Sequence, residues 1–541
     1  MNLLSEPWIP VRRRDDSREW IAPHQISDPD IVAFDADRPD FNGALAQFTI
    51  GLLQTTTPVD SPSVWRQLFA SPPGAVTLQS WFASVAAAFE FDGEGARFMQ
   101  DHSLKADEGT VNEIGALLIE SPGDSTLKKN IDHFVKRGQV GAICPYCAAT
   151  ALLTLQINAP EGGSGYLTGL RGGGPLSTLI VNQPQRSLWH DIWLNVQERL
   201  TFQARGGDAT KTAGYLTFPW LTDIGTIQKE GGKIAPVQVH PAHAYWAMPR
   251  RVRLDFDTVL AGSCGICDES SKVLVRQYNE KTKGLNYPSV LWEHPLSPYR
   301  QAKDGWLPLH PQPGGIGYRH WLAWVLGLSS DQKKQRPARV VEHFLEYRRR
   351  QVSGQLRLWA FGYSMKKDKA RCWYESHLPI YGLADCELEA QRRVESEVGD
   401  WLGGAELAAS YLCAAVKEAW FSGDARGDFG VIDASFWGRT EPDFYRQLKY
   451  LIEAVRDDRE VDALPVREAW HRLLIKAATD LFDKEFVGAG AIERQNPHRA
   501  AKAFQQLGRN LRGPKMRLAL GLPQLEANKP KRNGKAAASA A

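Results

Sequence analysis

The sequence contains no uninterrupted apolar run of the roughly 20 residues that a membrane-spanning helix needs. A secretory signal is missing as well, because Glu6 and three successive arginines, Arg12, Arg13 and Arg14, interrupt the N-terminus before an apolar core can form. Apolar residues make up 43% and charged residues 23%, which is the composition of an ordinary soluble globular protein. We therefore expect a cytoplasmic protein with no membrane segment.

The signatures of common enzyme classes are also missing. No phosphate-binding loop of the form GxxxxGK[ST] occurs, and GGDATKTAG at 206–214 only resembles one. There is no HExxH motif, and GGSGY at 162–166 departs from the GxSxG nucleophile elbow because Tyr166 replaces the last glycine. The thirteen histidines show no catalytic spacing with carboxylates. These absences favour a binding or scaffolding role over catalysis.

The length of the chain, 541 residues, is too great for a single hydrophobic core, and at roughly 150 residues per domain it predicts three or four units. Residues 1–384 mix short strand-like segments with helical patterns and long loops, which predicts a large mixed α/β domain. Past about residue 385 long helical periods take over. The predicted fold class is α+β, with residues 385–524 forming a C-terminal four-helix bundle and residues 525–541 a disordered tail.

Two apolar stripes indicate this bundle. One comprises Phe444, Leu448, Leu451, Ile452 and Val455, and the other comprises Trp470, Leu473, Leu474, Ala477, Ala478, Leu481 and Phe482. Both recur at the spacing of one helix face. The segments 405–420 and 496–511 supply two further helices, and the short connections indicate an up-down arrangement.

The formal net charge of +3 says little by itself, but the charge is unevenly distributed. Residues 492–541 hold eleven lysines or arginines and only two acids. Further basic stretches lie at 126–138, 347–350 and 365–371. Such segments are compatible with a surface that follows a nucleic-acid backbone, although any single one is more often solvated surface charge.

Four of the seven cysteines form two Cys-x-x-Cys pairs: Cys144 with Cys147, and Cys264 with Cys267. Each pair can fold into a knuckle that presents two thiolates, so two pairs in a cytosolic chain favour one tetrahedral, structural zinc site. Glycines and prolines around both pairs fit tight knuckle turns. The other three cysteines are scattered, which is typical of buried structural thiols.

Two alternatives to zinc stay open. Cys-Pro-Tyr-Cys is also the spelling of a glutaredoxin-type redox pair, but such a pair follows a strand near the start of a thioredoxin-like βαβ unit, and more than 140 residues precede Cys144. Free thiols are the second alternative. A zinc site would instead join segments 116 residues apart, with no open position for catalysis.

The segment 158–181 contains two glycine clusters, Gly162–Gly165 and Gly172–Gly174. Glycine has no Cβ, so its backbone can approach a bulky partner closely and offer amide and carbonyl groups. A nucleic-acid groove is one such partner. A flexible turn is the other interpretation, and glycine content alone slightly favours it.

Several segments together resemble one protein family: the opening MNLL…WIPVR, RFMQD at 97–101, APEGGSGYLTGLRGGGP at 159–175, WEHPLSPY at 292–299 and AFGYSMKKDKARCWYES at 360–376. They are similar to landmarks of the CasA family, the large subunit of the type I-E CRISPR surveillance complex, Cascade. The resemblance runs from Met1 through the helical C-terminal region.

The resemblance implies a non-catalytic protein that recognises the protospacer-adjacent motif (PAM) of duplex DNA from the minor groove. Such a protein promotes strand opening and R-loop formation, and recruits a separate helicase–nuclease. Its implied partners are the other Cascade subunits, the CRISPR guide RNA, the double-stranded target DNA and the displaced single strand. No membrane is involved.

The resemblance also implies which residues read the PAM. A glycine loop corresponds to Gly162, Gly163, Ser164 and Gly165. A lysine finger corresponds to Lys281, with Lys283 as the alternative. Ser164 departs from a pure glycine run.

A third implied element, a wedge between the DNA strands, corresponds to Lys366, Lys367 and Asp368. Some relatives carry Asn-Gln where this chain has two lysines, which donate hydrogen bonds but cannot accept them, so PAM preference could differ. A loop at the PAM-proximal end of the complex corresponds to Lys128, Lys129, Asn130 and Phe134. Not all members keep the zinc cysteines.

The basic face of the predicted bundle is expected to contact DNA phosphates through four residues: Arg499, Lys502, Arg509 and Arg512. Solvation of a helix or docking of a protein partner is the alternative. Two other function classes remain: a zinc-stapled nuclease or nucleotidyl enzyme, and a Cys-x-x-Cys redox protein. A zinc-stapled enzyme of this kind needs a carboxylate cluster to hold magnesium, and the sequence does not suggest one. Metal analysis of the purified protein would distinguish a redox protein from a zinc protein.

Overall fold

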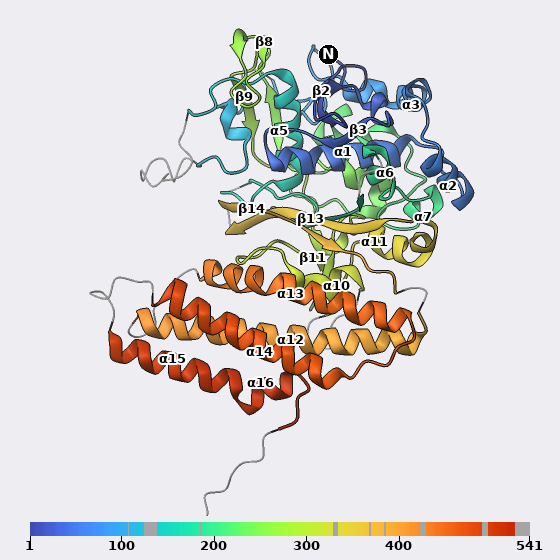
Figure 1. The fold of residues 1–541 in the computed structure, drawn as a ribbon. Helices are drawn as coiled ribbons and strands as arrows, with labels where there is room; N and C mark the ends of the chain where they lie inside the picture. The colour runs from blue at the N-terminus through green and yellow to red at the C-terminus, as the bar shows by residue number, and fades with distance from the viewer. Residues whose placement is uncertain are drawn as a thin grey trace, which may run out of the picture. The chain divides into compact units, whose positions relative to one another are not determined.

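The computed structural model describes residues 1–105, 108–123, 138–163, 165–183, 187–327, 334–366, 369–383, 386–421, 429–488 and 496–524. The chain divides into two compact units, unit 1 (Met1–Asp385) and unit 2 (Cys386–Ala541). Strands lie in unit 1 and long helices in unit 2, so the protein is mixed α/β, as the sequence predicts (Figure 1). Among the described residues, no helix is both long and apolar enough to cross a bilayer.

Unit 1 is organised around two buried helices, α1 (Pro39–Thr56) and α5 (Pro145–Asn158), which pack against each other. Each begins with proline at its first helical position, where the missing N–H costs nothing. Both helices are buried on nearly all sides, which explains why neither sequence shows a clean amphipathic stripe.

An aromatic cluster forms the core beside α1. Phe48 of α1 meets Trp8, Phe89, Phe98 and Trp246, with ring centroids 5.1 to 5.9 Å apart and planes nearly perpendicular. Such edge-to-face pairs stabilise a core beyond the burial of their area. The indole N–H groups of the two tryptophans in this cluster have partners: that of Trp8 donates to the carbonyl of Leu3 at 2.7 Å, and that of Trp246 donates to the hydroxyl of Thr55 at 3.1 Å.

The strands of unit 1 form five small sheets in the part of the chain that the structure describes. Their strand orders are β2-β1-β3, β11-β10-β12, β14-β13-β5, β4-β9-β6 and β7-β8. The N-terminal strands are β1 (Ile9–Arg13), β2 (Arg18–Ile21) and β3 (Ile31–Phe34). The middle strands are β4 (Thr110–Glu113), β5 (Ser177–Gln183), β6 (Arg251–Leu254), β7 (Leu260–Ser263), β8 (Ser270–Leu274) and β9 (Gln277–Lys281). The last are β10 (Tyr299–Ala302), β11 (Gly305–Pro308), β12 (Gln335–Arg336), β13 (Gln355–Lys366) and β14 (Lys369–Pro379).

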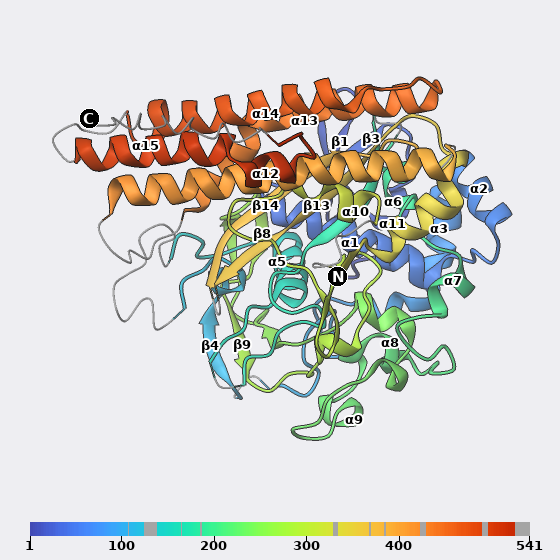
Figure 2. The ribbon, with the colours of Figure 1, turned by 90° about the horizontal axis from the view of Figure 1, so that it is seen from below.

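Short helices fill the connections of unit 1, and long loops separate them, as the sequence predicts. The helices are α2 (Pro62–Ala70), α3 (Ala75–Phe82), α6 (Leu188–Trp193), α7 (Arg199–Gln203), α8 (Gly214–Thr217), α9 (Ile224–Ile227), α10 (Trp321–Val325) and α11 (Arg339–His343). Figure 2 shows β4 beside β9, in agreement with their antiparallel pairing.

Unit 2 consists of helices in its described part. They are α12 (Leu388–Trp420), α13 (Gly430–Arg456), α14 (Ala463–Asp480), α15 (Pro497–Arg512) and the short α16 (Pro514–Ala519). Helices α12 to α15 run alongside one another (Figure 1; Figure 2), and α12 contacts each of the others.

Burial in unit 2 follows the two apolar stripes of the sequence. Phe444, Leu448, Leu451 and Ile452 are buried on α13, and so are Trp470, Leu474, Ala477 and Ala478 on α14. The indole of Trp470 donates to the carbonyl of Trp401 on α12 at 3.0 Å. The apolar periodicity therefore located the core of this unit correctly.

Candidate metal centre and nucleic-acid interface

The two Cys-x-x-Cys pairs meet in unit 1. Cys144 is the N-cap of α5 and Cys147 lies in its first turn, whereas Cys264 and Cys267 lie in the connection between β7 and β8. Their four Sγ atoms all lie within 4.8 Å of one another, and all four side chains are buried. None of them forms a disulfide. The predicted meeting of the two pairs is confirmed.

The geometry of this four-cysteine cluster fits a tetrahedral metal. The Sγ atoms of Cys144 and Cys267 are 3.9 Å apart. Four thiolates at about 2.3 Å from one zinc ion would be separated by about 3.8 Å. Two backbone amides donate hydrogen bonds to sulfur atoms of the cluster. Cys144 N–H donates to Cys264 Sγ at 3.3 Å, and Cys147 N–H donates to Cys144 Sγ at 3.5 Å.

Electrostatics also favour a cation at the cluster. Hydrogen bonding from the other three thiols, with burial added, raises the pKa of Cys147 far above its ordinary value. Without a positive ion the cluster cannot carry four negative charges, whereas a bound metal deprotonates its thiol ligands. The donor set is therefore that of a closed, structural metal centre.

Backbone contacts hold the two knuckles together beside the sulfurs. Gly265 N–H donates to the carbonyl of Ala142 at 2.9 Å, and Ile143 forms an antiparallel bridge with Val275. Asp268 adopts a left-handed φ of 59°, which turns the chain back into β8. The cluster thus fixes the start of α5 against the β7–β8 hairpin.

From this cluster the chain continues through α5 to one segment and through β8 and β9 to another, and these two segments contact each other. The glycine loop follows α5, and the turn of Thr282 and Lys283 follows β9. Lys283 N–H donates to the carbonyl of Gly165 at 2.8 Å. Gly165 has a φ of 88°, and a Cβ there would lie 2.9 Å from the Cβ of Thr282. Glycine is required at this contact on both conformational and steric grounds.

Sequence reasoning missed a buried arginine beneath the glycine loop. Arg250 donates to the carbonyl of Pro160 at 2.5 Å, and its guanidinium lies 4.8 Å from the centre of the Tyr166 ring. Burial lowers the pKa of Arg250, while nearby Glu280 opposes that shift. Arg250 lies directly before β6 in a basic run with Arg251 and Arg253, and nothing in that run distinguishes a supporting arginine from a surface one.

The two lysine candidates differ in their surroundings. Lys281 ends β9, and its ammonium pairs with Glu108 at 3.1 Å. Lys283 has a left-handed φ of 62°, a side chain that is 72% exposed and a long 3.4 Å pair with Glu230, which is itself exposed. Exposed pairs of this kind are weak. Lys283, the alternative from sequence, is the lysine whose backbone bonds to the glycine loop.

The second glycine cluster packs against the end of β13 that precedes the predicted wedge. A Cβ at Gly174 would lie 2.7 Å from the carbonyl oxygen of Tyr363 and 2.8 Å from the Cγ of Met365. Lys366 ends β13 and is paired in register with Lys369 at the start of β14. Lys366 is therefore exposed near the tip of the β13–β14 hairpin.

A buried charge cluster supports the same part of β13, and the sequence did not indicate it. The hydroxyl of Tyr363 donates to Asp40 at 2.7 Å and lies 3.1 Å from Glu120. Arg38 bridges the same two carboxylates. Burial raises the pKa of Asp40, and Arg38 counteracts that shift. These residues are more than 200 positions from Tyr363 in sequence, so only the fold brings them together.

The four basic residues predicted on the bundle lie on α15. Arg499 donates to the carbonyls of Ala419 and Trp420 at the end of α12, so it has a structural use. Lys502 pairs loosely with Glu418 at 3.8 Å. Arg509 and Arg512 are exposed, and among the described residues their side chains donate to Gln506 and to the Gly508 carbonyl of the same helix.

Seven predicted site residues lie outside the described residues: Ser164, Lys367 and Asp368, together with Lys128, Lys129, Asn130 and Phe134. Their roles stay predictions.

Comparison with known proteins decides the family. The family model of CRISPR-associated protein Cse1 matches residues 2–481. The chain belongs to the Cse1 family. The resemblance to CasA that the sequence motifs carried is thereby confirmed, since Cse1 and CasA name the same protein in Thermus thermophilus.

Solved structures of Cse1 proteins share this fold at low sequence identity. CasA (Cse1) of Thermus thermophilus is 18% identical, covers 94% of this chain and 99% of its own, and has a TM-score of 0.66. Cse1 of Thermobifida fusca is 15% identical over 96% of this chain and 98% of its own, with a TM-score of 0.68. A chain of a CRISPR RNA-guided surveillance complex is 16% identical over 95% and 99%, with a TM-score of 0.65.

The packing of Gly174 generates a prediction about this Cse1 chain. Gly174→Val places a branched side chain at a φ of 61° and against the backbone of β13. We expect it to reduce the free energy of unfolding by about 1–3 kcal/mol, measured by urea or thermal unfolding. Gly163→Ala is the matched control, because its Cβ meets nothing within 4 Å. Equal unfolding midpoints for the two variants would contradict the packing argument.

Proposed function

We propose that this chain is the large, non-catalytic subunit of a type I-E CRISPR RNA-guided surveillance complex in the cytoplasm. In this role it recognises a PAM in duplex DNA, promotes strand opening and R-loop formation, and recruits a helicase–nuclease that performs the covalent chemistry. Membership of the Cse1 family supports the assembly, and so does the likeness to chains of such complexes. Its partners are the other Cascade subunits, the guide RNA, the target duplex and the displaced strand.

The observation that carries the DNA-reading part is the hydrogen bond between Lys283 and Gly165. It sets Gly165, which has no side chain, beside a lysine whose ammonium group is exposed. Such a surface can enter a narrow groove, because glycine presents no Cβ to the groove walls. In the minor groove A·T and T·A pairs both offer only acceptors, and lysine is a donor. A reader of this kind tolerates several related PAMs and leaves further specificity to guide pairing.

The wedge in this proposal comprises Lys366, Lys367 and Asp368, of which Lys366 ends β13 and is paired with Lys369 at the start of β14. Gly174, Tyr363 and the carboxylates below them support the hairpin base. Pressing the tip between base pairs costs a few kcal/mol of unstacking per step. Contacts of the two lysines with phosphates and groove acceptors offset part of that cost.

The metal in this proposal is a structural zinc ion held by Cys144, Cys147, Cys264 and Cys267. Four thiolates at tetrahedral separation are the ligand set that zinc prefers. The glycine loop begins 15 residues after Cys147, and Lys281 lies 14 residues after Cys267. Zinc would therefore anchor both DNA-reading segments at one point.

Unit 2 contributes a basic surface in this proposal. Helices α12 to α15 form a four-helix bundle, and Lys502, Arg509 and Arg512 bind phosphates of the duplex or the displaced strand. Arg499 acts first as a cap on α12, so its contribution to DNA binding is smaller. The PAM-proximal loop with Lys128, Lys129, Asn130 and Phe134 completes the interface.

The zinc proposal predicts one zinc ion per purified chain. Cys264→Ser removes one ligand and should lower both the zinc content and the thermal midpoint, because a structural zinc site contributes to folding free energy. Elemental analysis and thermal unfolding measure the two effects. Cys372→Ser is the control, since Cys372 is exposed and lies outside the cluster. Zinc-free wild-type protein would contradict the proposal.

The PAM proposal predicts sequence-selective effects of the two lysines in the assembled complex. Lys283→Ala should weaken binding to a PAM-containing duplex about tenfold or more, as expected for a charge-assisted hydrogen bond of about 1.5–3 kcal/mol. Lys281→Ala should have a smaller effect, because the Lys281 side chain is less exposed than that of Lys283 (43% against 72%) and its ammonium lies closer to a carboxylate, 3.1 Å from Glu108 against 3.4 Å from Glu230. Dissociation constants on duplexes that differ only in the PAM measure both effects.

Lys303→Ala serves as the control for this experiment, since Lys303 is an exposed lysine in the turn between β10 and β11. If Lys283→Ala weakened duplexes with and without the PAM equally, its role would be a phosphate contact and the groove-reading proposal would fail.

The wedge proposal predicts that Lys366→Ala and Lys367→Ala act on strand opening. Cleavage of a fully duplex target should slow, and a target with a pre-opened bubble beside the PAM should restore it. The reason is that a wedge acts after docking and is dispensable once the strands are apart. Equal impairment on both substrates would assign these lysines to ordinary phosphate binding.

A further inference from the structure

A pocket of about 200 Å³ lies between α6, β3 and one face of the β14-β13-β5 sheet, and its lining includes neither the glycine loop nor the cysteine cluster. Leu188, Asp191, Ile192 and Asn195 line it from α6 and the turn that follows, at the spacing of one helix face. Asn195 uses its side-chain amide within the fold, because it binds both the N–H and the carbonyl of Ile180. Asp191 is therefore the polar group of this wall that has an oxygen to spare.

The opposite wall of the pocket is the face of the sheet. Trp359 of β13 is paired in register with Leu179 of β5 and with His377 of β14, so the three side chains share one face. Glu375 lies two residues before His377 and is on the same face. Glu375 and His377 are exposed, so the pocket is open beside β14. The Nε1 atom of Trp359 is buried away from solvent, so the accessible part of its ring is carbon.

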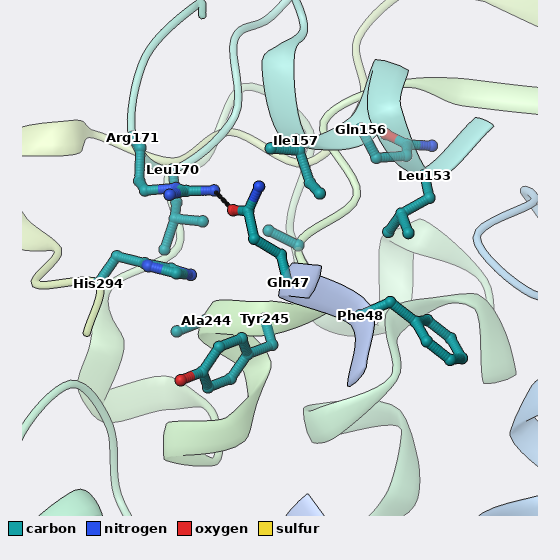
Figure 3. Close-up of a pocket in the computed structure, with 11 residues that line it drawn as sticks. Gln47, Phe48, Leu153, Gln156, Ile157, Leu170, Arg171, Ala244, Tyr245 and His294 are labelled. Atoms are coloured by element: carbon teal, nitrogen blue, oxygen red, sulfur yellow. Dashed lines mark hydrogen bonds between the residues drawn. The ribbon is translucent and has the colours of Figure 1, made fainter. Parts of the chain in front are cut away.

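The cavity in Figure 3 differs from this pocket in size and polarity. It has a volume of about 20 Å³ and is lined by Gln47, Arg171 and Tyr245, among others. One water needs about 10–15 Å³, and the Tyr245 hydroxyl, which has no partner among the described residues, can accept a hydrogen bond from it. That cavity therefore needs no ligand other than water. The pocket beside α6 is about ten times larger and has room for a side chain.

Asp191 has no cation to balance its charge among the described residues. Its Oδ1 accepts the N–H of Asn182 at 2.7 Å, and no other hydrogen bond or ion pair from those residues reaches its carboxylate. Burial raises the pKa of Asp191 to about 7, and only the N–H of Asn182 opposes that shift. The carboxylate thus loses hydration without gaining a partner, which is costly unless a ligand supplies one. A carboxyl group perturbed in this way within a pocket is a candidate for ligand binding.

The other titratable groups of the pocket come from β14. Glu375 accepts the indole N–H of Trp373 at 3.0 Å and pairs with no cation among the described residues. Burial lowers the pKa of His377, Glu375 opposes that shift and Arg357 on β13 adds to it, so the ring is neutral at pH 7. The walls formed by β3, β5 and α1 contribute no titratable side chain. The charge of the pocket lining is therefore negative.

This lining favours an organic cation as the ligand. An anion would meet two carboxylates, and a purely apolar ligand would leave Asp191 unpaired. Asp191, Glu375 and His377 do not form a metal-binding group in the described part of the chain. The apolar walls instead suit a cation that has a hydrocarbon stem. Guanidinium fits best, because it is planar and weakly hydrated, binds a carboxylate through two N–H groups and stacks on aromatic rings such as that of Trp359.

We propose that this pocket, defined by Asp191, Trp359 and Glu375, receives an arginine side chain of a partner protein. The guanidinium donates to Asp191 and lies against the ring of Trp359, and the hydrocarbon stem of the arginine covers the apolar wall. The choice of a protein as the partner rests on the proposed assembly with other Cascade subunits, which brings protein surfaces against this chain. The choice of a guanidinium rests on the pocket alone.

NMR titration of the full chain with acetyl-arginine methylamide tests the pocket without any partner protein. We expect a dissociation constant on the order of 1 mM at pH 8. Acetyl-citrulline methylamide, the uncharged isostere, and acetyl-lysine methylamide should bind more weakly. Asp191→Asn keeps the acceptor for Asn182 and should abolish the preference for arginine over citrulline. Asp304→Asn is the control, since Asp304 is exposed in the turn between β10 and β11. Equal binding of the three probes by the wild-type chain would overturn the proposal.

The affinity for the arginine probe should also depend on pH. It should rise about tenfold between pH 6 and pH 8, because the cation binds the ionised form of a carboxyl group whose pKa is about 7. Asp191→Asn should abolish this rise, and His377→Gln should keep it. A rise that survives in Asp191→Asn but is lost in His377→Gln would assign it to the histidine and overturn the proposal.

Arg186, which precedes α6, lies outside the described residues and provides a further control. Arg186→Gln should leave binding of the arginine probe unchanged. Tighter binding by this variant would show that an arginine of this chain already occupies the pocket, and would overturn the proposal.

Reconstitution of the complex tests the partner. Asp191→Asn should weaken incorporation of this chain at least threefold, while the PAM dependence of DNA binding by the assembled complex is unchanged. Normal incorporation of Asp191→Asn, despite selective binding of the arginine probe, would overturn the choice of a protein partner. The two proposals fail separately: a wild-type chain that ignores the probe but assembles rejects only this inference, and a chain that binds the probe but does not assemble rejects the proposed function.

Discussion

The meeting of four sulfur atoms is the constraint on which the rest of unit 1 depends. Cys144 and Cys147 open the central helix α5, and Cys264 and Cys267 turn the β7–β8 hairpin, so their cluster joins segments 116 residues apart. From this point the chain runs through α5 into the glycine loop and through β8 and β9 into the turn of Thr282 and Lys283. The hydrogen bond from the Lys283 N–H to the Gly165 carbonyl then joins the ends of these two segments.

The candidate DNA-reading surface consists of glycine-rich backbone that rests on buried, hydrogen-bonded side chains. The glycine loop presents little side-chain volume, and Arg250 holds its base through Pro160. The second glycine cluster lies against β13, where Tyr363 is bound to buried carboxylates. Buried arginines and carboxylates are costly unless they are satisfied, and here Arg250 and Asp40 both have hydrogen-bond partners.

The sequence predicted those features that depend on local pattern. Cysteine spacing predicted the cluster, and helical periodicity predicted the buried faces of α13 and α14, because both signals are carried by neighbouring residues. It could not predict the contacts of Arg250 or the Asp40–Tyr363 contact, since single polar residues acquire partners only through long-range packing. Our proposal prefers Lys283 to Lys281 because of the turn after β9, and only the backbone geometry reveals that turn.

Hydrogen exchange measured with and without a metal chelator tests most directly whether the cysteine cluster positions the glycine loop and the turn of Thr282 and Lys283, the two candidate DNA-reading segments. We predict that chelation increases exchange in residues 138–163 and 260–283 together, because both segments share one anchor, while unit 2 is unchanged. Unchanged exchange in either segment, or an equal increase across both units, would contradict the central role of the cluster.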